Sequence, residues 1–337
     1  MKKILLNTLI TGFLATASLT ALAADYKLDI SLDTGPTHIR NESIEKFADE
    51  LQARSEGKLE VRVFHGAAKY KGGNVPTALA QGALDMGAPL HQHLSKIIPE
   101  AGAVLLPMFY GATPEENHAV WDGPVGDSLN AMIEDKLKVK IIGRYFDLGY
   151  GSVFTTEKKL ETPTDMEGMK MRVPGGAANV QRYKVFGASP VSIPFSDVPQ
   201  ALQRGTVDGI WSTQESVRSA KLWESGIKFA FEDRQAYLQY VPMVNLAKWN
   251  SYPDDIKALI ENTWEDMIGD VRDVAQKRQL EARGVGAVNG VITVDPVAEE
   301  LANMREKLLA VQPEIVEELG IDQAFVEQIG VELEKLR

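Results

Sequence analysis

Arg172 is the side chain of this sequence best suited to hold a charged ligand. Met169, Met171 and Val173 alternate with charged residues, a pattern that predicts a β-strand. Pro174 cannot donate a hydrogen bond to a sheet, so the strand should end there and place Arg172 at its carboxyl end. In open α/β sheets, ligands bind at that edge. The planar guanidinium can hold a carboxylate by two parallel hydrogen bonds, although an exposed salt bridge is the commoner role of an arginine.

The five histidines are the other candidates for ligand or metal chemistry. His91 and His93 would share one face on a strand, but no further residue follows at metal-ligand spacing, so we expect no metal site. Both come just after a short predicted strand, and His38 follows the first predicted strand. Each of these three is therefore either a solvated loop residue or a ligand contact.

No enzyme motif accompanies these residues. The sequence has no Gly-x-Gly-x-x-Gly, no Gly-x-Ser-x-Gly, no phosphate-binding Gly-Lys-Ser/Thr loop and no His-Glu-x-x-His. It also has no cysteine that could act as a nucleophile. We therefore expect a protein that is not an enzyme and that binds no cofactor.

Four short segments around Arg172 follow one another in a characteristic order. Lys-Met-Arg-Val-Pro is followed by Gly-Ala-Ser-Pro-Val, by Phe-Ser-Asp-Val, and by Ala-Leu-Gln-Arg-Gly-Thr-Val-Asp-Gly. In this order and spacing they resemble the signature of the solute-binding proteins of tripartite ATP-independent periplasmic (TRAP) transporters, of the C4-dicarboxylate-binding (DctP) type. Weaker similarity covers nearly all of the mature chain. The segments are residues 170–174, 187–191, 195–198 and 201–209.

The resemblance implies roles for particular residues. Arg172 would hold the ligand carboxylate, and Phe195 and the residues after the Val-Asp-Gly segment would line the pocket. Ser212 stands where the family commonly has Asn, and Ser152 stands where the sialic-acid-binding branch has a second arginine. Both departures argue against the family's familiar substrates, dicarboxylates and sialic acid. The two serines suggest a small or hydroxylated acid rather than a large one, and a sulfonate would suit the same arginine.

Three further residues complete the predicted site. Trp211 stands at the end of a predicted strand and is either a core residue or a pocket wall. Gln235 and Tyr237 precede the strand expected to return to the first lobe. In the resembled family, the first lobe touches its ligand at about the position of His91 and His93.

The N-terminus has the pattern of a secretory signal peptide. Two lysines precede an apolar run over residues 4–22, which ends in Ala-Leu-Ala, so we expect cleavage after Ala23 and a periplasmic protein. A lipoprotein needs a cysteine at the cleavage site, and because the sequence has none, we expect the mature protein to be free in the exported compartment. The chain carries a net charge of −11, and removal of the two leader lysines leaves 34 basic and 47 acidic residues, or −13. This balance argues against a nucleic-acid partner.

Hydrophobic periodicity predicts the elements that position the site. A β-α-β opening indicates a parallel sheet. A Thr-Pro-Glu-Glu capping box at Thr113 should start another helix, and Ser196 should cap a further one. A long helix should begin at Pro253 and be broken over residues 284–289. The predicted strands are 27–32, 59–64, 86–90, 139–146, 207–211, 240–246 and 291–294. The first main helix should end at residue 55, and further helices should cover residues 75–84, 125–137, 176–186 and 196–203.

With the resemblance, these elements indicate an α/β, two-lobed periplasmic-binding-protein fold. Each lobe should hold a mixed sheet, the chain should cross between the lobes at a hinge, and a long helix should span both. We expect lobe one from residues 24–148 plus about 238–275, and lobe two from 149–237 plus about 276–337, after a signal peptide over 1–23.

The expected function follows from the same resemblance. A monomer would capture a small organic acid by closure of the lobes and deliver it to a TRAP membrane permease, which has two types of subunit and is driven by an ion gradient. Two alternatives are a solute-binding protein of an ATP-driven importer and an exported enzyme that acts on organic acids. Analysis of neighbouring genes and of the chemical state of the released ligand would separate them.

Overall fold

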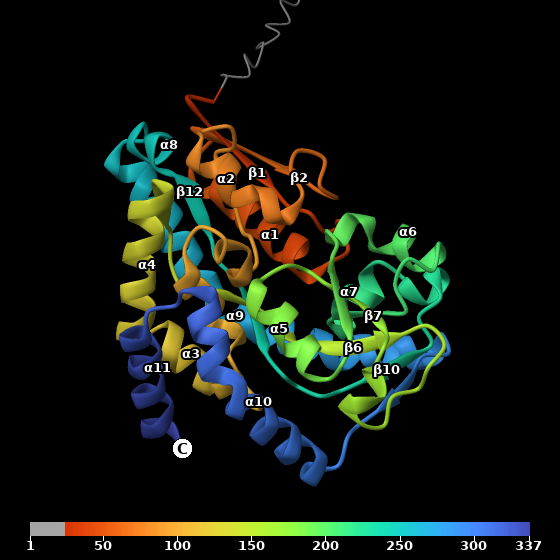
Figure 1. Ribbon diagram of the computed structural model, residues 1–337. Helices are drawn as coiled ribbons and strands as arrows, with labels where there is room; N and C mark the ends of the chain where they lie inside the picture. The colour runs from red at the N-terminus through yellow and green to blue at the C-terminus, as the bar shows by residue number, and fades with distance from the viewer. Residues whose placement is uncertain (1–23) are drawn as a thin grey trace, which may run out of the picture.

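The computed structural model describes residues 24–337, which form two lobes (Figure 1). The predicted leader and its cleavage after Ala23 lie outside the described residues. Among residues 24–337, no helix combines the length and the apolar character needed to cross a membrane.

The first lobe contains a five-stranded mixed sheet with the order β2-β1-β3-β12-β4. Its first three strands are parallel, and the β-α-β prediction is confirmed, because α1 links β1 to its parallel neighbour β2. β12 runs antiparallel to both β3 and β4. The bounds are β1 Tyr26–Ser31, α1 Ile39–Arg54, β2 Leu59–Phe64, β3 Met86–Gly87, β4 Val139–Ile141 and β12 Met243–Asn245.

The second lobe contains a six-stranded mixed sheet with the order β13-β10-β6-β9-β7-β8. The strand predicted to carry Arg172 is β7, which ends before Pro174 as expected. It pairs in parallel with β8 and β9, so its carboxyl end meets theirs at one edge of the sheet. The bounds are β6 Ser152–Thr155, β7 Lys170–Val173, β8 Ser189–Ser192, β9 Gly209–Ser212, β10 Phe229–Phe231 and β13 Ile292–Val294.

Two crossing strands and one long helix join the lobes. β5 (Phe146–Tyr150) leaves the first sheet and β11 (Tyr237–Tyr240) returns to it, and the two pair antiparallel as a separate ribbon. Helix α9 (Asp254–Val288) packs against α1 of the first lobe, against β5, and against α7 (Gln214–Ser219) of the second. The predicted hinge crossings and spanning helix are therefore present.

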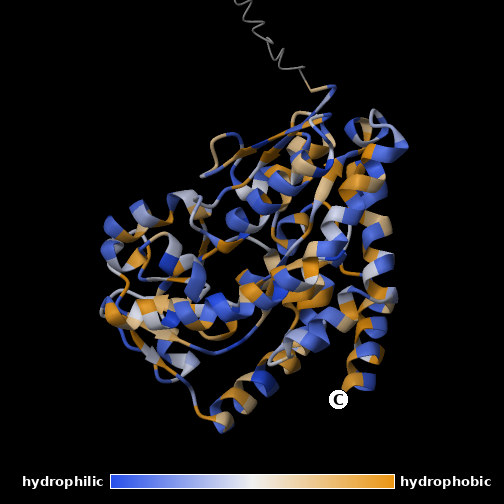
Figure 2. Cartoon of the chain, turned by 180° about the vertical axis from the view of Figure 1, so that it is seen from behind, coloured by the Kyte–Doolittle hydropathy of each residue, from blue (hydrophilic) through white to orange (hydrophobic). Residues whose placement is uncertain are grey.

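The remaining helices cover the sheets and extend the lobes (Figure 1). The C-terminal helix α11 packs on α3 and α4, and it buries an apolar face while its other face stays polar (Figure 2). Both α3 and α4 lie within residues 24–148, the range predicted for lobe one. The lobe bounds inferred from the sequence stay a prediction. The bounds are α2 Val75–Ala80, α3 Pro114–Trp121, α4 Pro124–Leu137, α5 Ala177–Val185, α6 Val198–Gln203, α8 Leu246–Asn250, α10 Ala298–Leu319 and α11 Gln323–Leu336.

Local signals located some helix ends well and others poorly. The capping box at Thr113 is confirmed, because its side chain accepts from the Glu116 amide and Glu116 returns a bond to the Thr113 amide. The Ser196 cap is wrong: residues 195–197 form a short 3-10 helix, and α6 starts one residue after it. The predicted break over 284–289 is also wrong, since α9 continues through Gly284 and Gly286 to Val288. A glycine inside a helix costs only about 1 kcal/mol relative to alanine, so two of them need not end a long helix.

Candidate functional site

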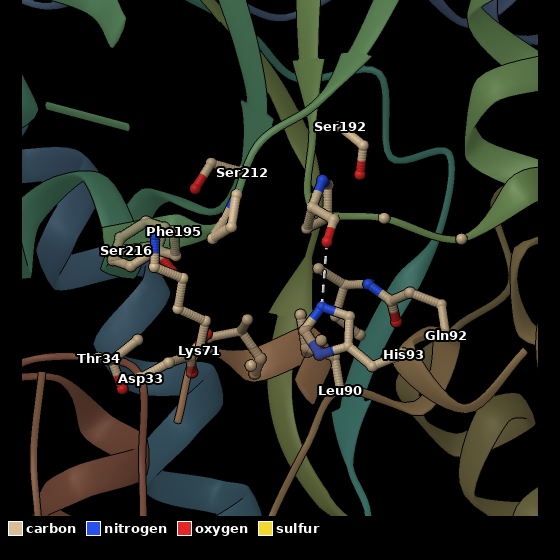
Figure 3. A pocket seen from close by; sticks show the side chains of 18 of the residues that line it. Asp33, Thr34, Lys71, Leu90, Gln92, His93, Ser192, Phe195, Ser212 and Ser216 are labelled. Atoms are coloured by element: carbon tan, nitrogen blue, oxygen red, sulfur yellow. Dashed lines mark hydrogen bonds between the residues drawn. The ribbon is translucent and has the colours of Figure 1, made fainter. Parts of the chain in front are cut away.

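A cavity of about 310 Å³ lies between the two lobes, at the carboxyl ends of β1 and β7. Residues of the first lobe form one wall, and residues of the second lobe form the opposite wall (Figure 3). The hinge strands β5 and β11 contribute Leu148, Leu238 and Tyr240 to its floor. The volume is at the lower end of the range of about 300–1,000 Å³ that is usual for small-molecule pockets. The site therefore suits a small ligand.

Arg172 lines this cavity and is only 2% exposed. Its Nε donates to the Ile193 carbonyl at 2.8 Å and its Nη1 to the Trp211 carbonyl at 3.1 Å. Within residues 24–337, no carboxylate lies in ion-pair range of the guanidinium. Burial lowers the pKa of Arg172 to about 10, with Asp33 acting in the opposite direction, so the side chain remains charged at neutral pH. The protein thus holds a buried, fixed cation that faces a cavity.

Three other predicted residues line the same cavity. The Phe195 ring centroid lies 5.9 Å from Cζ of Arg172, close enough for a cation–π contact. Trp211 is fully buried and Ser212 is 7% exposed, and the two are the last residues of β9. Of the residues after Val-Asp-Gly, Trp211 and Ser212 line the cavity and Ile210 does not, and their contact with a ligand stays a prediction.

The three predicted histidines have different positions. His93 lines the cavity, and its Nε2 lies 3.1 Å from the Pro174 carbonyl of the other lobe (Figure 3). His91 instead lies fully buried between the rings of Trp121 and Tyr145, and burial lowers its pKa to about 3. Neither ring nitrogen of His91 has a hydrogen-bond partner among the described residues. His91 is a core residue in this structure.

His38 lies behind the cavity wall. Its Nδ1 accepts from the Arg40 amide at 3.1 Å, so Nε2 carries the proton and donates to Ser216 Oγ, also at 3.1 Å. Burial lowers the pKa of His38 well below its usual range, which keeps the ring neutral. Ser216 lines the cavity, so His38 orients a wall residue from behind.

Ser152, Gln235 and Tyr237 are not among the residues that line the cavity. The Ser152 hydroxyl donates to Glu232 at 2.7 Å, and Gln235 accepts from Arg182. The Tyr237 hydroxyl donates to Asp147 at 2.7 Å. Side chains alternate between the two faces of a strand, and in β11 the neighbouring Leu238 and Tyr240 face the cavity. The position of a residue along a strand does not by itself tell which face of the strand turns toward the cavity.

The sequence analysis missed a buried ion pair on the first-lobe wall. Asp33 and Arg40 are 8% and 2% exposed and bond to each other. Arg40 also donates from Nε to Thr34 Oγ1 at 3.1 Å and lies over the Tyr240 ring, 4.5 Å from its centroid. Asp33 stands two residues after the end of β1, so the strand-end argument used for Arg172 would have found it.

Gln92 is a second residue that the sequence analysis missed. It lines the cavity and is 1% exposed, and neither its amide oxygen nor its amide nitrogen has a hydrogen-bond partner among the described residues. Buried amides in proteins are nearly always hydrogen-bonded. No signal in the sequence distinguishes this glutamine from a surface one.

Several contacts join the two walls and hold the lobes together. Lys71 Nζ lies 2.6 Å from Asp197 Oδ2 at the rim of the cavity. The Ile39 amide donates to Glu215 Oε1 at 2.8 Å, and Arg218 Nη2 donates to the Thr37 carbonyl at 2.7 Å. Because each contact links a first-lobe residue with a second-lobe residue, the structure has the closed arrangement of the two lobes.

Gly151, where the chain passes from β5 to β6, is required by the Trp211 wall. A Cβ there would lie 2.3 Å from two ring carbons of Trp211. We expect Gly151→Ala to lower the free energy of unfolding by about 1–3 kcal/mol, the usual cost of overpacking, as measured by denaturant titration. Gly269→Ala is the control, since a Cβ added there would meet no atom within 4 Å outside the neighbouring backbone of α9, and alanine favours a helix. Equal stability of the two variants would contradict this account of Gly151.

Comparison with known proteins places these features in a family. The family model for "Bacterial extracellular solute-binding protein, family 7" (DctP) matches residues 30–319. The chain is 29% identical over 253 residues to the 2,3-diketo-L-gulonate-binding periplasmic protein YiaO of Escherichia coli, covering 75% of this chain and 76% of the relative. It is 26% identical over 315 residues to the C4-dicarboxylate-binding periplasmic protein DctP of Rhodobacter capsulatus, covering 93% of each.

Solved structures show the same fold. The sugar acid binding protein DctPAm of Advenella mimigardefordensis, in complex with galactonate, matches with a TM-score of 0.87 at 19% identity, over 92% of this chain and 98% of that one. A TRAP periplasmic solute-binding protein of Sulfurospirillum deleyianum, with bound succinate, matches with a TM-score of 0.81 at 22% identity, over 91% and 99%. These likenesses confirm the two-lobed α/β fold predicted from the sequence.

Proposed function

This chain belongs to family 7 of the bacterial extracellular solute-binding proteins, the DctP family, and from that premise we propose that it captures a small organic acid between its lobes. It is a solute-binding protein of the TRAP type. The acid would lie in the interlobe cavity, with its carboxylate on Arg172.

The observation that carries this proposal is a buried cation that has no carboxylate partner in the part of the chain that the structure describes. Desolvating a charge is costly unless an opposite charge and hydrogen bonds compensate for it. Two backbone carbonyls hold the Arg172 guanidinium in place, while Nη2 has no acceptor among residues 24–337. A ligand carboxylate would supply the missing partner through charge-assisted hydrogen bonds, which are about twice as strong as neutral ones. The relatives named for diketogulonate and C4-dicarboxylates bind carboxylic acids, which supports the same chemistry.

Closure would couple ligand capture to delivery. The contacts between the walls, such as Lys71 with Asp197, exist only when the lobes are together. A ligand that bridges both walls favours this state, and a nearly complete shift from open to closed needs about 5.5 kcal/mol of differential affinity. The closed protein would then be recognised by the membrane permease of a TRAP transporter.

The finer assignments are parts of the same proposal. The mature protein would be a periplasmic monomer, released by cleavage after Ala23, and it would act without catalysing a reaction. A thermal-shift screen of the purified protein against carboxylic and sulfonic acids tests the ligand class. Recovery of the bound acid chemically unchanged tests the absence of catalysis. A product in place of the added acid would support the exported enzyme instead.

A further inference from the structure

The charges that line the cavity leave room for one strongly bound anionic group. Arg40 is paired with Asp33, and Lys71 is paired with Asp197. Arg172 is the buried cation of the lining that has no carboxylate partner among the described residues, whereas Lys96 is exposed to solvent at the rim. The deep part of the cavity therefore offers, among residues 24–337, a single buried positive charge that no carboxylate neutralises, and this charge lies on the second-lobe wall.

The first-lobe wall opposite Arg172 offers hydrogen-bond acceptors. Asp33 Oδ1 accepts a hydrogen bond from Arg40. No side chain of the described residues donates to its other oxygen, Oδ2. Gly72 makes space for this oxygen, because a Cβ there would lie 2.2 Å from Oδ2. Burial raises the pKa of Asp33, but the charge of Arg40 and its hydrogen bond lower it further, so the net shift is downward and the carboxylate stays ionised.

His93 and Gln92 add to this wall. Because His93 Nε2 must carry a proton to donate to the Pro174 carbonyl, Nδ1 is left as an acceptor, and it has no partner among residues 24–337. Gln92 offers both an acceptor and a donor that are unpaired in the same part of the chain. A ligand group that faces this wall must be able to donate hydrogen bonds.

We propose that the ligand is a monocarboxylic acid that carries hydroxyl groups, with its carboxylate on Arg172 and its hydroxyls on Asp33, His93 and Gln92. This inference rests on the proposed function. A hydroxyl donates to the Asp33 carboxylate or to the imidazole and also accepts from an amide, so it satisfies every unpaired group of the wall. A second carboxylate at the same place would instead lie against Asp33, and like charges in a buried site are strongly disfavoured.

Calorimetry with acids of equal length tests the inference. We would titrate the protein with threonate, butanoate and succinate, and with gluconate, hexanoate and adipate. In at least one of these series the hydroxylated monoacid is expected to bind at least 100-fold more tightly than the plain monoacid and the diacid. A diacid that binds as tightly as the hydroxylated acid, or a plain monoacid that does, would overturn the inference but leave the capture of an organic acid intact. If no acid of either series binds, the proposed function fails as well.

Two variants assign the preference to the wall. Gln92→Leu loses no hydrogen bond within the described residues, so the variant should fold normally. It is expected to weaken the binding of the hydroxylated acid at least tenfold and to leave the affinity for the plain monoacid unchanged. Asp33→Asn is expected to reduce the ratio of the diacid's dissociation constant to that of the hydroxylated acid at least tenfold. Asp49→Asn, on the exposed side of α1 away from the cavity, is the matched control and should change neither ratio. Unchanged ratios in both Gln92→Leu and Asp33→Asn would refute the roles given to this wall.

Discussion

Replacement of Arg172 by lysine is expected to weaken the binding of the captured acid at least tenfold, or by at least about 1.4 kcal/mol. Lysine retains the positive charge, so a purely electrostatic role would survive the change. It cannot, however, bond the Ile193 and Trp211 carbonyls and still present a planar pair of donors to a carboxylate. The loss would therefore measure the geometry of the fork rather than its charge.

The experiment compares dissociation constants from calorimetry with one acid and three proteins. Arg204→Lys is the matched control, because Arg204 is exposed at the end of α6 and does not line the cavity. It should bind the acid as the unmodified protein does. Equal affinity of the Arg172→Lys and Arg204→Lys variants would remove Arg172 from the site and leave only the family membership and the fold as evidence for the binding mode.

The second large effect concerns the pH dependence of stability. Asp233 is fully buried, and burial raises its pKa to about 7 against the opposing effect of Arg182. The amide of Gln235 bridges the two side chains, since it donates to Asp233 and accepts from Arg182. Other ionisable neighbours are Glu232, which raises this pKa further, and the phenols of Tyr110 and Tyr183. Asp233 is therefore a carboxyl group that the folded protein prefers to keep protonated.

The direction of the effect follows from proton linkage. Between the reference pKa of 3.8 and the folded value of about 7, the folded state binds a proton that the unfolded state has lost, so the stabilisation is present below this window and is lost as the pH rises through it. A shift of this size corresponds to at most about 4 kcal/mol. We expect the stability of Asp233→Asn relative to the unmodified protein to rise by up to this amount between pH 4 and pH 8, as followed by urea unfolding. Parallel pH profiles of the two proteins would contradict it.

Local sequence patterns located the main cation of the site. The alternation around Met171, ended by Pro174, gave Arg172 a position at the carboxyl end of a strand, and β7 ends there. The reason is that alternation and proline act within a few residues of chain. The same reasoning would have reached Asp33 after β1, because both strands end at the cavity.

His91 and His93 show where such patterns stop being sufficient. On a strand they would share a face, but residues 91–94 form a 3-10 helix, in which residues two positions apart point in different directions. One ring therefore enters the core beside Trp121, and the other reaches the Pro174 carbonyl. The short apolar run before them predicted a strand over residues 86–90. The strand β3 covers only Met86 and Gly87, the two residues that pair with β1 and β12.

The sequence by itself determined the order of the elements, the family signature, and an arginine at a strand end. Only the tertiary structure decided that, within residues 24–337, this arginine is buried without a counter-charge, Asp33 neutralises Arg40, and the Gln92 amide has no hydrogen-bond partner. These properties depend on which segments from distant parts of the chain meet, and on which face of each strand turns toward the other lobe. Burial and pairing are set by that packing, because a charge or an amide acquires its energetic cost only when water has been removed from around it.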